Sequence, residues 1–441
     1  APPAAAQAPL SLAADAPPPA EAGSVALEVL PQFKALTDDV TELNVLVRLT
    51  GTSDAPAQRP PLDLALVLDR SGSMRGDKMR DVKAAGLQLL EALGPSDRVT
   101  LLSYSDQVLT HAVRLPVDGQ GREELRRALL AIEANGGTAL GPATAEALDL
   151  LERAADDAGR TAHVMLLSDG LANVGEQRPD VLGARTAAGF RQGVTFSTLG
   201  VGVDYNEDLM TRLADAGGGR YHFIQSGQAV ARVLDDELKG LVATVARGVE
   251  LDLALPAGVE LVKVFGYPTR QDDGRHSVRI GTLGARQVRE VMIRLRLPMG
   301  RDGDVALGKI GLRYVDMPAD GVAREAIAGL AVARAASADA MRQSEAPAVS
   351  VRVAEVESAE QLELAARAAD RGDFAQAQGL LRVAIDDLRR KDMVAPSPKL
   401  KAQIAAFEEA DGEMEGARAS ESGRKGYTKK LKSRAYESKK R

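Results

Sequence analysis

A carboxylate and two hydroxyls directly follow an apolar run near residue 70. The run, residues 62–68, reads LDLALVL; Asp69 comes next, and the chain continues RSGSM with Ser71 and Ser73. Side chains of these types could act as a nucleophile, as part of a phosphate-binding loop or as oxygen ligands of a cation. Residues elsewhere in the chain discriminate between these three chemistries.

The first two chemistries lack their usual companions. A nucleophilic serine needs an activating base, most often histidine, held by a third group. None of the four histidines is expected in a loop beside this turn, and His163 and His222 lie in strand-like runs, which favours packed structural roles. A phosphate loop requires a glycine-rich Gly-Lys-Ser/Thr or Gly-x-Gly-x-x-Gly pattern, which DRSGSM lacks. The sequence therefore favours a protein that is not an enzyme.

Two further loops supply oxygen-bearing side chains that suit a cation. Asp169 follows the apolar run AHVMLLS, and Thr138 lies in NGGTAL, ahead of an expected helix. The carboxyl ends of parallel strands meet at one edge of a doubly wound sheet, so these loops are expected to converge there. Several hard oxygens from separate loops are what Mg²⁺ and Ca²⁺ prefer. The predicted metal ligands are Asp69, Ser71, Ser73, Thr138 and Asp169.

Strand-like and helix-like runs alternate between residues 60 and 243. This order predicts an α/β fold with a doubly wound, mostly parallel sheet and right-handed crossovers. The expected strands are residues 62–68, 98–104, 162–168, 194–202 and 217–224. The expected helices are residues 77–93, 121–133, 142–157, 178–191, 206–216 and 227–243.

The segments around this unit have other patterns. Residues 24–51 and 244–318 contain short strands punctuated by Gly and Pro, and we expect them to form one antiparallel β-sandwich into which residues 60–243 are inserted. Residues 319–417 are Ala-rich and are predicted to be a helical region. A pair of helices around Gly372 resembles a tetratricopeptide hairpin, but one hairpin is too few for a peptide-binding solenoid.

Both ends of the chain are predicted to be disordered. Residues 1–23 contain ten Ala and six Pro, which is typical of a linker, and a start at Ala in place of Met favours an exported protein, periplasmic, cell-surface or secreted, over a cytoplasmic one. Residues 418–441 are predicted to be a basic tail that could touch an anionic surface, with no nucleic acid expected as a partner. The chain has no Cys and no apolar run of the ~20 residues needed to cross a bilayer.

The proposed ligands also occur in a known arrangement. Asp69-x-Ser71-Gly-Ser73, then Thr138, then Asp169-Gly170 resemble the metal-ion-dependent adhesion site of von Willebrand factor type A (VWA) domains in order, spacing and strand context. The resemblance covers about residues 60–243. The flanking strands are similar to those of bacterial relatives of inter-α-trypsin-inhibitor heavy chains and of calcium-activated chloride-channel-like proteins.

This resemblance implies a divalent cation, Mg²⁺ most often and otherwise Ca²⁺ or Mn²⁺. It implies direct ligation through the hydroxyls of Ser71, Ser73 and Thr138, with Asp69 and Asp169 acting directly or through water. A partner protein would supply an Asp or Glu to the metal, in adhesion or scaffolding. Two alternatives remain open: a metal that only stabilises the fold, and an intracellular VWA partner of an AAA-type ATPase in a chelatase or cofactor-insertion complex.

Overall fold

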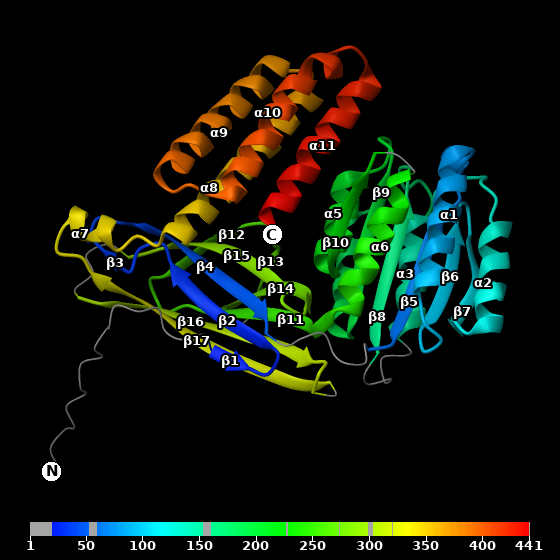
Figure 1. Cartoon of the computed structure of the whole chain (residues 1–441), viewed down its shortest axis with the longest axis horizontal. Coiled ribbons are helices and arrows are strands. Elements are labelled where there is room, and N and C mark those ends of the chain that lie inside the picture. The colour runs from blue at the N-terminus through cyan, green and yellow to red at the C-terminus, as the bar shows by residue number, and fades with distance from the viewer. Residues whose placement is uncertain are drawn as a thin grey trace, which may run out of the picture.

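The computed structural model of the chain describes residues 20–52, 60–152, 160–225, 228–272, 274–298, 303–319 and 321–440. The described residues form three units (Figure 1). The α/β unit covers residues 62–242, and the helical unit covers residues 338–439. The β-sandwich combines residues 20–51 with residues 244–334, so the α/β unit is inserted into it.

A six-stranded sheet forms the centre of the α/β unit. Its strands are β5 Leu62–Asp69, β6 Arg98–Tyr104, β7 Val108–Pro116, β8 Thr161–Ser168, β9 Val194–Val201 and β10 Gly218–Ile224. Their order is β10-β9-β8-β5-β6-β7, and all neighbours are parallel except β7, which runs antiparallel to β6. The strand order reverses at β5, which is therefore the switch point where such sheets place their sites.

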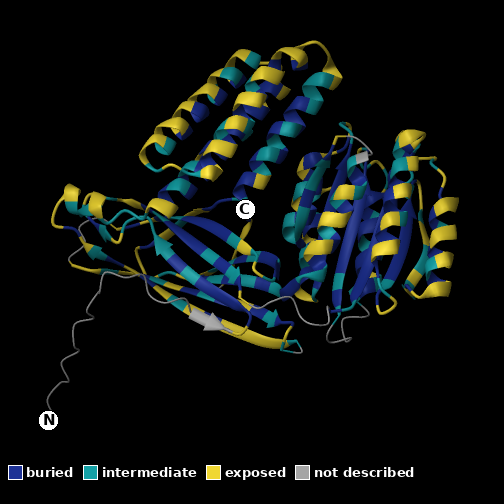
Figure 2. Ribbon diagram, in the orientation of Figure 1, coloured by how far each residue is buried: buried dark blue, intermediate teal, exposed yellow. Residues whose placement is uncertain are grey.

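Helices cover both faces of this sheet (Figure 2). They are α1 Asp77–Ala92, α2 Gly119–Ala131, α3 Leu140–Glu152, α4 Pro179–Arg191, α5 Glu207–Ala216 and α6 Gln228–Val242. Leu64 and Leu66 of β5 pack in the core with α1, α2 and α6, whereas Ala65 and Val67 pack in the core with α3, α4 and α5. This two-sided burial explains the unbroken apolar run in the sequence.

The β-sandwich consists of two sheets, ordered β1-β2-β4-β15-β12 and β13-β14-β11-β16-β17-β3. β4 pairs with β15 in a register that sets Val45 opposite Ile293. This pairing confirms that residues 24–51 join residues 244–318 in one sandwich. The strands are β1 Ala20–Ala22, β2 Val25–Pro31, β3 Ala35–Leu36, β4 Glu42–Gly51, β11 Thr244–Ala254, β12 Glu260–Val264, β13 Thr269–Asp272, β14 Arg275–Gly284, β15 Val288–Arg296, β16 Val305–Asp316 and β17 Val322–Arg334.

The predicted start of the helical region at residue 319 was wrong. Residues 322–334 form β17, which pairs with β16 over its length, as in the partners Ile327 and Gly311. Alanine favours helices, but pairing with a neighbouring strand overrides this weak local preference. The helices are α7 Ala338–Gln343, α8 Pro347–Asp370, α9 Phe374–Val394, α10 Pro398–Arg418 and α11 Glu421–Lys439.

The prediction of a disordered basic tail at residues 418–441 was also wrong, because residues 421–439 form α11. Tyr427, Leu431 and Ala435 recur every four residues and are buried with α8, α9 and α10. Five of the basic side chains of α11 pair with acids, as Arg434 does with Glu409 at 2.5 Å. The many basic residues of this segment therefore led to the wrong prediction, although its apolar residues form one buried face of a packed helix.

The N-terminal linker was predicted over residues 1–23. Residues 1–19 lie outside the described residues, and Ala20–Ala22 form β1, which pairs with β2. Among the described residues, no helix combines the length and the apolar character needed to cross a bilayer.

Two histidines pack within the α/β unit, as the sequence predicts. His163 on β8 is buried, with Nδ1 2.6 Å from Thr195 Oγ1 and Nε2 3.7 Å from Glu237 Oε2. The His222 Nε2 lies 2.8 Å from Glu237 Oε1. Burial lowers the pKa of His163 to about 4, although the charge of Glu237 opposes the shift.

This buried histidine makes stability depend on pH. The neutral form is favoured in the fold, so its contribution is present above the unfolded pKa near 6.5 and is lost as the pH falls towards 4. The loss reaches about 3 kcal/mol when the shift is converted at about 1.4 kcal/mol per pKa unit. We expect urea unfolding of His163→Gln, which carries no titrating ring, to depend less on pH than the natural chain between pH 7 and 4.5. Equal slopes for the two proteins would contradict this account.

Candidate metal centre

Asp69 organises the first loop of the candidate site at the carboxyl end of β5. It is fully buried; its Oδ1 accepts a hydrogen bond from the Ser71 N–H at 2.8 Å, and its Oδ2 accepts one from the Ser168 hydroxyl at 2.7 Å. Burial raises the pKa of Asp69, and the hydrogen bonds from both serines oppose that shift. Asp69 therefore fixes the conformation of this loop and also contributes a negative charge to the candidate site.

Ser71, Ser73 and Asp169 form a chain of oxygen atoms. The Ser71 and Ser73 hydroxyls are 3.0 Å apart, and the Ser73 hydroxyl donates to Asp169 Oδ1 at 2.7 Å. The two serines are held by a single 3-10 turn over Gly72–Met74, whose Met74 is buried in the core. Asp169 is fully buried at the end of β8, whereas Ser73 is exposed, so this group of oxygens opens to the surface on the serine side.

Thr138 joins this group from the loop before α3. The loop is fixed by the Gly72 N–H, which donates to the Gly136 carbonyl at 3.0 Å, and by Asn173 Oδ1, which accepts from the Thr138 N–H at 2.7 Å. A Cβ placed on Gly170 would lie 3.4 Å from Ser73 Oγ and 3.5 Å from Thr138 Oγ1. The two hydroxyls therefore face a common space beside Gly170.

The structure thus brings all five predicted residues to one edge of the sheet. Within the described residues the Thr138 hydroxyl makes no hydrogen bond, and no group of three or more His, Cys, Asp or Glu side chains is arranged to hold a metal. Such a donor set, with two carboxylates and three hydroxyls, suits a hard cation that keeps several waters. The residues therefore fit a divalent cation.

Lys78 is a member of the site that the sequence reasoning missed. Its ammonium, on the first turn of α1, pairs with Asp169 Oδ2 at 2.5 Å, and the side chain is partly exposed. It neutralises a buried carboxylate that would otherwise be costly to ionise. The sequence feature that could have pointed to Lys78 is its position on the first turn of the helix that follows the Ser-x-Ser turn. Two more residues of the site were not predicted: Ser168, whose hydroxyl donates to Asp69, and Asn173, whose side chain accepts from the Thr138 N–H.

Comparison with known proteins identifies the unit that carries this site. A family model described as the von Willebrand factor type A domain matches residues 63–236. This part of the chain is a VWA domain. The match spans the five candidate ligands and the whole six-stranded sheet from β5 to β10.

Two curated relatives match stretches of 255 and 181 residues of this chain. Uncharacterized protein YfbK of Escherichia coli (strain K12) is 29% identical over 255 residues, which cover 55% of this chain and 42% of that protein. Inter-alpha-trypsin inhibitor heavy chain H4 of Bos taurus is 28% identical over 181 residues, which cover 40% of this chain and 20% of that protein. The chain therefore spans less than half the length of both of these curated relatives.

A solved structure shares the fold of nearly the whole chain. The von Willebrand factor type A protein from Catenulispora acidiphila superposes with a TM-score of 0.74, at 19% sequence identity, over 94% of this chain and 97% of that one. At this identity the likeness concerns the fold alone. The VWA domain, sandwich and helices therefore form an arrangement found in another protein.

Gly170 of the VWA domain offers a direct probe of the candidate site. Its φ is not positive, so alanine fits the backbone, but the added methyl occupies the space that Ser73 Oγ and Thr138 Oγ1 share. We expect Gly170→Ala to weaken Mg²⁺ binding at least about tenfold, or about 1.4 kcal/mol, in isothermal titration. The control is Gly379→Ala on α9, where nothing lies within 4 Å of an added Cβ. Equal affinities in the two variants would show that the cation binds elsewhere.

Proposed function

We propose that the VWA domain binds one divalent cation, Mg²⁺, at Asp69, Ser71, Ser73, Thr138 and Asp169, and that this site captures a carboxylate of a partner protein. The observation that carries the proposal is the common space beside Gly170, which the hydroxyls of Ser73 and Thr138 face. In this proposal the protein is a binding module and performs no catalysis.

The chain's own residues support capture at this edge. The negative charges of both carboxylates are partly offset: Asp169 pairs with Lys78, and Asp69 accepts hydrogen bonds from Ser71 and Ser168, which reduces the repulsion of an approaching acidic side chain. Hydroxyls supply most of the donors, so a bound cation would keep enough positive charge to accept a partner's carboxylate as a further ligand. Leu171, next to Gly170, is 58% exposed and gives the partner an apolar contact beside the cation.

The experiment is affinity capture from lysate and envelope fractions, with partners identified by mass spectrometry. The natural chain in Mg²⁺ is compared with the same chain in EDTA, with Thr138→Val and with the matched control Thr138→Ser, which keeps the hydroxyl. We expect a partner that is retained by the natural chain and by Thr138→Ser in Mg²⁺ and lost in the other two samples. A partner retained in all four would place its binding surface on the sandwich, the helices or another face of the VWA domain.

A further inference from the structure

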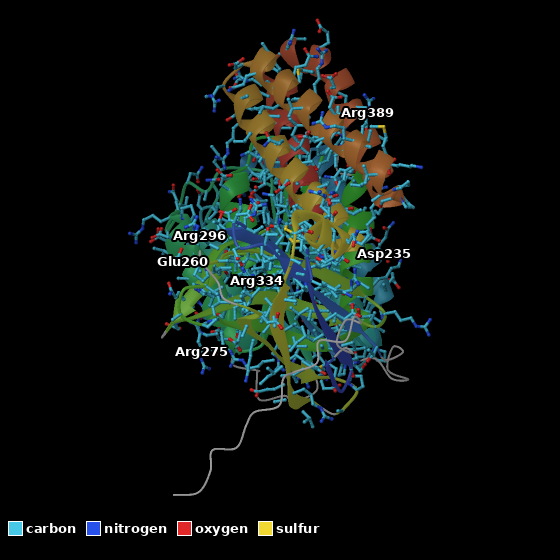
Figure 3. All side chains as sticks on the ribbon, turned by 90° about the vertical axis from the view of Figure 1, so that its left-hand side faces the viewer. Asp235, Glu260, Arg275, Arg296, Arg334 and Arg389 are labelled. Atoms are coloured by element: carbon cyan, nitrogen blue, oxygen red, sulfur yellow. The ribbon has the colours of Figure 1, made fainter. Side chains whose placement is uncertain are left out.

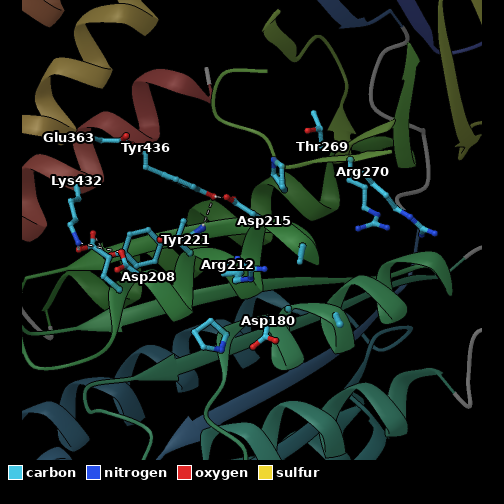
Figure 4. A pocket seen from close by; sticks show the side chains of 18 of the residues that line it. Asp180, Asp208, Arg212, Asp215, Tyr221, Thr269, Arg270, Glu363, Lys432 and Tyr436 are labelled. Carbon is cyan, nitrogen blue, oxygen red and sulfur yellow. Dashed lines mark hydrogen bonds and ion pairs between the residues drawn. The ribbon is translucent and has the colours of Figure 1, made fainter. Parts of the chain in front are cut away.

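A cavity of about 1010 Å³ lies where the three units meet (Figure 4). Its walls come from α4 and α5 of the VWA domain, β13 and β14 of the sandwich, and α8 and α11 of the helical unit. The volume is at the upper end of the range of small-molecule sites in proteins. The cavity is separate from the candidate metal centre, since the two have no lining residue in common.

Most acidic side chains of this cavity pair with lysines of α11 and the residue after it. Lys432 pairs with Asp208 at 3.4 Å and with Glu207 at 3.6 Å, as Figure 4 shows for the α11 side of the cavity. Lys440 pairs with Asp215 at 2.5 Å. A fourth acid, Glu363 of α8, pairs with Lys439 at 2.6 Å. Three lysines thus offset three of these four negative charges. With Asp180 and Asp370, which also line the cavity, three acidic charges remain, against five lining arginines.

Three of the five arginines that line the cavity, Arg212, Arg279 and Arg367, have no acidic partner within the described residues. Among the described residues, the guanidinium groups of Arg212 on α5 and Arg367 on α8 make no hydrogen bond or ion pair. Arg279 on β14 is half-buried, and its Nε–H is buried without a hydrogen-bond partner. Its guanidinium lies over the Phe190 ring at 5.7 Å, which leaves its N–H groups free to bind other atoms.

Arg279 also lies near two other arginines and one acid. Burial lowers its pKa, the charges of Arg191 and Arg270 lower it further, and Glu250 opposes them. β13 and β14 pair with Arg270 opposite Ser277, so Arg270 and Arg279 lie on the same face of this hairpin. Arg270 has one acidic partner, Asp272, at 2.5 Å. Guanidinium groups gathered in this way are stabilised by an anion, which accepts paired N–H bonds in the planar fork geometry.

We propose that this interdomain cavity binds a small molecule with two or more oxyanion groups, held by Arg270 and Arg279 of the sandwich and by Arg212 of the VWA domain. Phosphoryl and carboxylate groups share the required chemistry, because both accept bidentate bonds from arginine. The bound molecule bridges the VWA domain and the sandwich and so fixes the angle between them. The proposal is independent of the metal centre and of its partner.

The test is isothermal titration of the full chain with pyrophosphate, triphosphate and citrate, in EDTA so that the candidate metal centre has no part in the result. The variants are Arg279→Gln and Arg212→Gln, one from each wall. The matched control is Arg275→Gln, which removes an exposed arginine from the same strand, β14, outside the cavity lining (Figure 3). A further variant, Arg279→Lys, keeps the positive charge but removes the planar fork of guanidinium N–H donors.

We expect one site, with affinity lowered at least about tenfold in both cavity variants and unchanged in the control. Tighter binding of the phosphates than of citrate would identify a phosphorylated ligand, and the reverse a polycarboxylate. Three results would overturn the proposal. The first is no binding of any of the three anions at millimolar concentration, and the second is equal affinity in all variants. The third is an affinity lowered in only one of the two cavity variants, since the anion would then contact one unit and would not bridge the VWA domain and the sandwich. Circular dichroism without anion confirms that each variant is folded.

Discussion

Thr138→Val is expected to abolish the stabilisation of the chain by Mg²⁺. A ligand at a hundredfold excess over its Kd stabilises the folded state by about 2.7 kcal/mol. For a unit the size of the VWA domain this corresponds to a rise in Tm of about 5–10 °C, from about 2–4 °C per kcal/mol. Valine has the shape of threonine without the hydroxyl, so the variant removes one donor and leaves the packing of a side chain that is only 3% exposed.

The choice of Thr138 follows from the hydrogen bonds of the site. Asp69 is a poorer probe, because its loss would leave the buried Ser71 N–H without an acceptor and would remove the nearer acceptor of the Ser168 hydroxyl. The Thr138 hydroxyl has no such role within the described residues. In EDTA we expect Thr138→Val to have about the same Tm as the natural chain, and Thr138→Ser to have a lower Tm because it removes a buried methyl group. We expect Mg²⁺ to raise the Tm of the natural chain and of Thr138→Ser, and to leave that of Thr138→Val unchanged. A full shift in Thr138→Val would remove Thr138 from the ligand set.

Leu431→Ala is expected to destabilise the helical unit by about 2–5 kcal/mol, the cost of cutting a fully buried leucine back to alanine. Leu431 is fully buried on α11, in the core formed with α8, α9 and α10. If the C-terminal residues were a disordered tail, the same change would be worth no more than about 0.5 kcal/mol. The measurement is urea unfolding followed by circular dichroism.

The matched control for this prediction is Leu364→Ala on α8, whose side chain is 44% exposed. We expect it to cost well under half as much as Leu431→Ala. The two variants remove the same atoms from neighbouring helices, so a difference between them reports burial. Equal, small effects would contradict the packing of α11 on the other helices.

The parts of the fold that the sequence predicts are those in which local pattern and burial agree. β5 and β8 are apolar throughout because helices cover both faces, and their carboxyl ends place Asp69 and Asp169 by a topological rule. β7 was missed because its residues face partly to solvent and do not alternate. The Ala-rich β17 was predicted as helix because its pairing with β16 is not encoded locally.

Contacts between segments that are far apart in the sequence could not be predicted, for a different reason. Lys432 and Asp208 are 224 residues apart in the chain, so nothing in a local window links α11 to α5. The pairing of Lys78 with Asp169 depends in the same way on two side chains from separate loops. The cavity arginines come from three units, and only the arrangement of these units places them together.

The central claim is that one divalent cation lies between the hydroxyls of Ser73 and Thr138 and the carboxylate of Asp169. The most direct measurement is anomalous diffraction from crystals of the full chain soaked in MnCl₂, since Mn²⁺ takes the same oxygen donors as Mg²⁺. The account predicts one strong anomalous peak in the space beside Gly170, about 2.0–2.3 Å from Ser73 Oγ and from Thr138 Oγ1. A soaked crystal with no peak there, or with its strongest peak at another group of carboxylates, would contradict it.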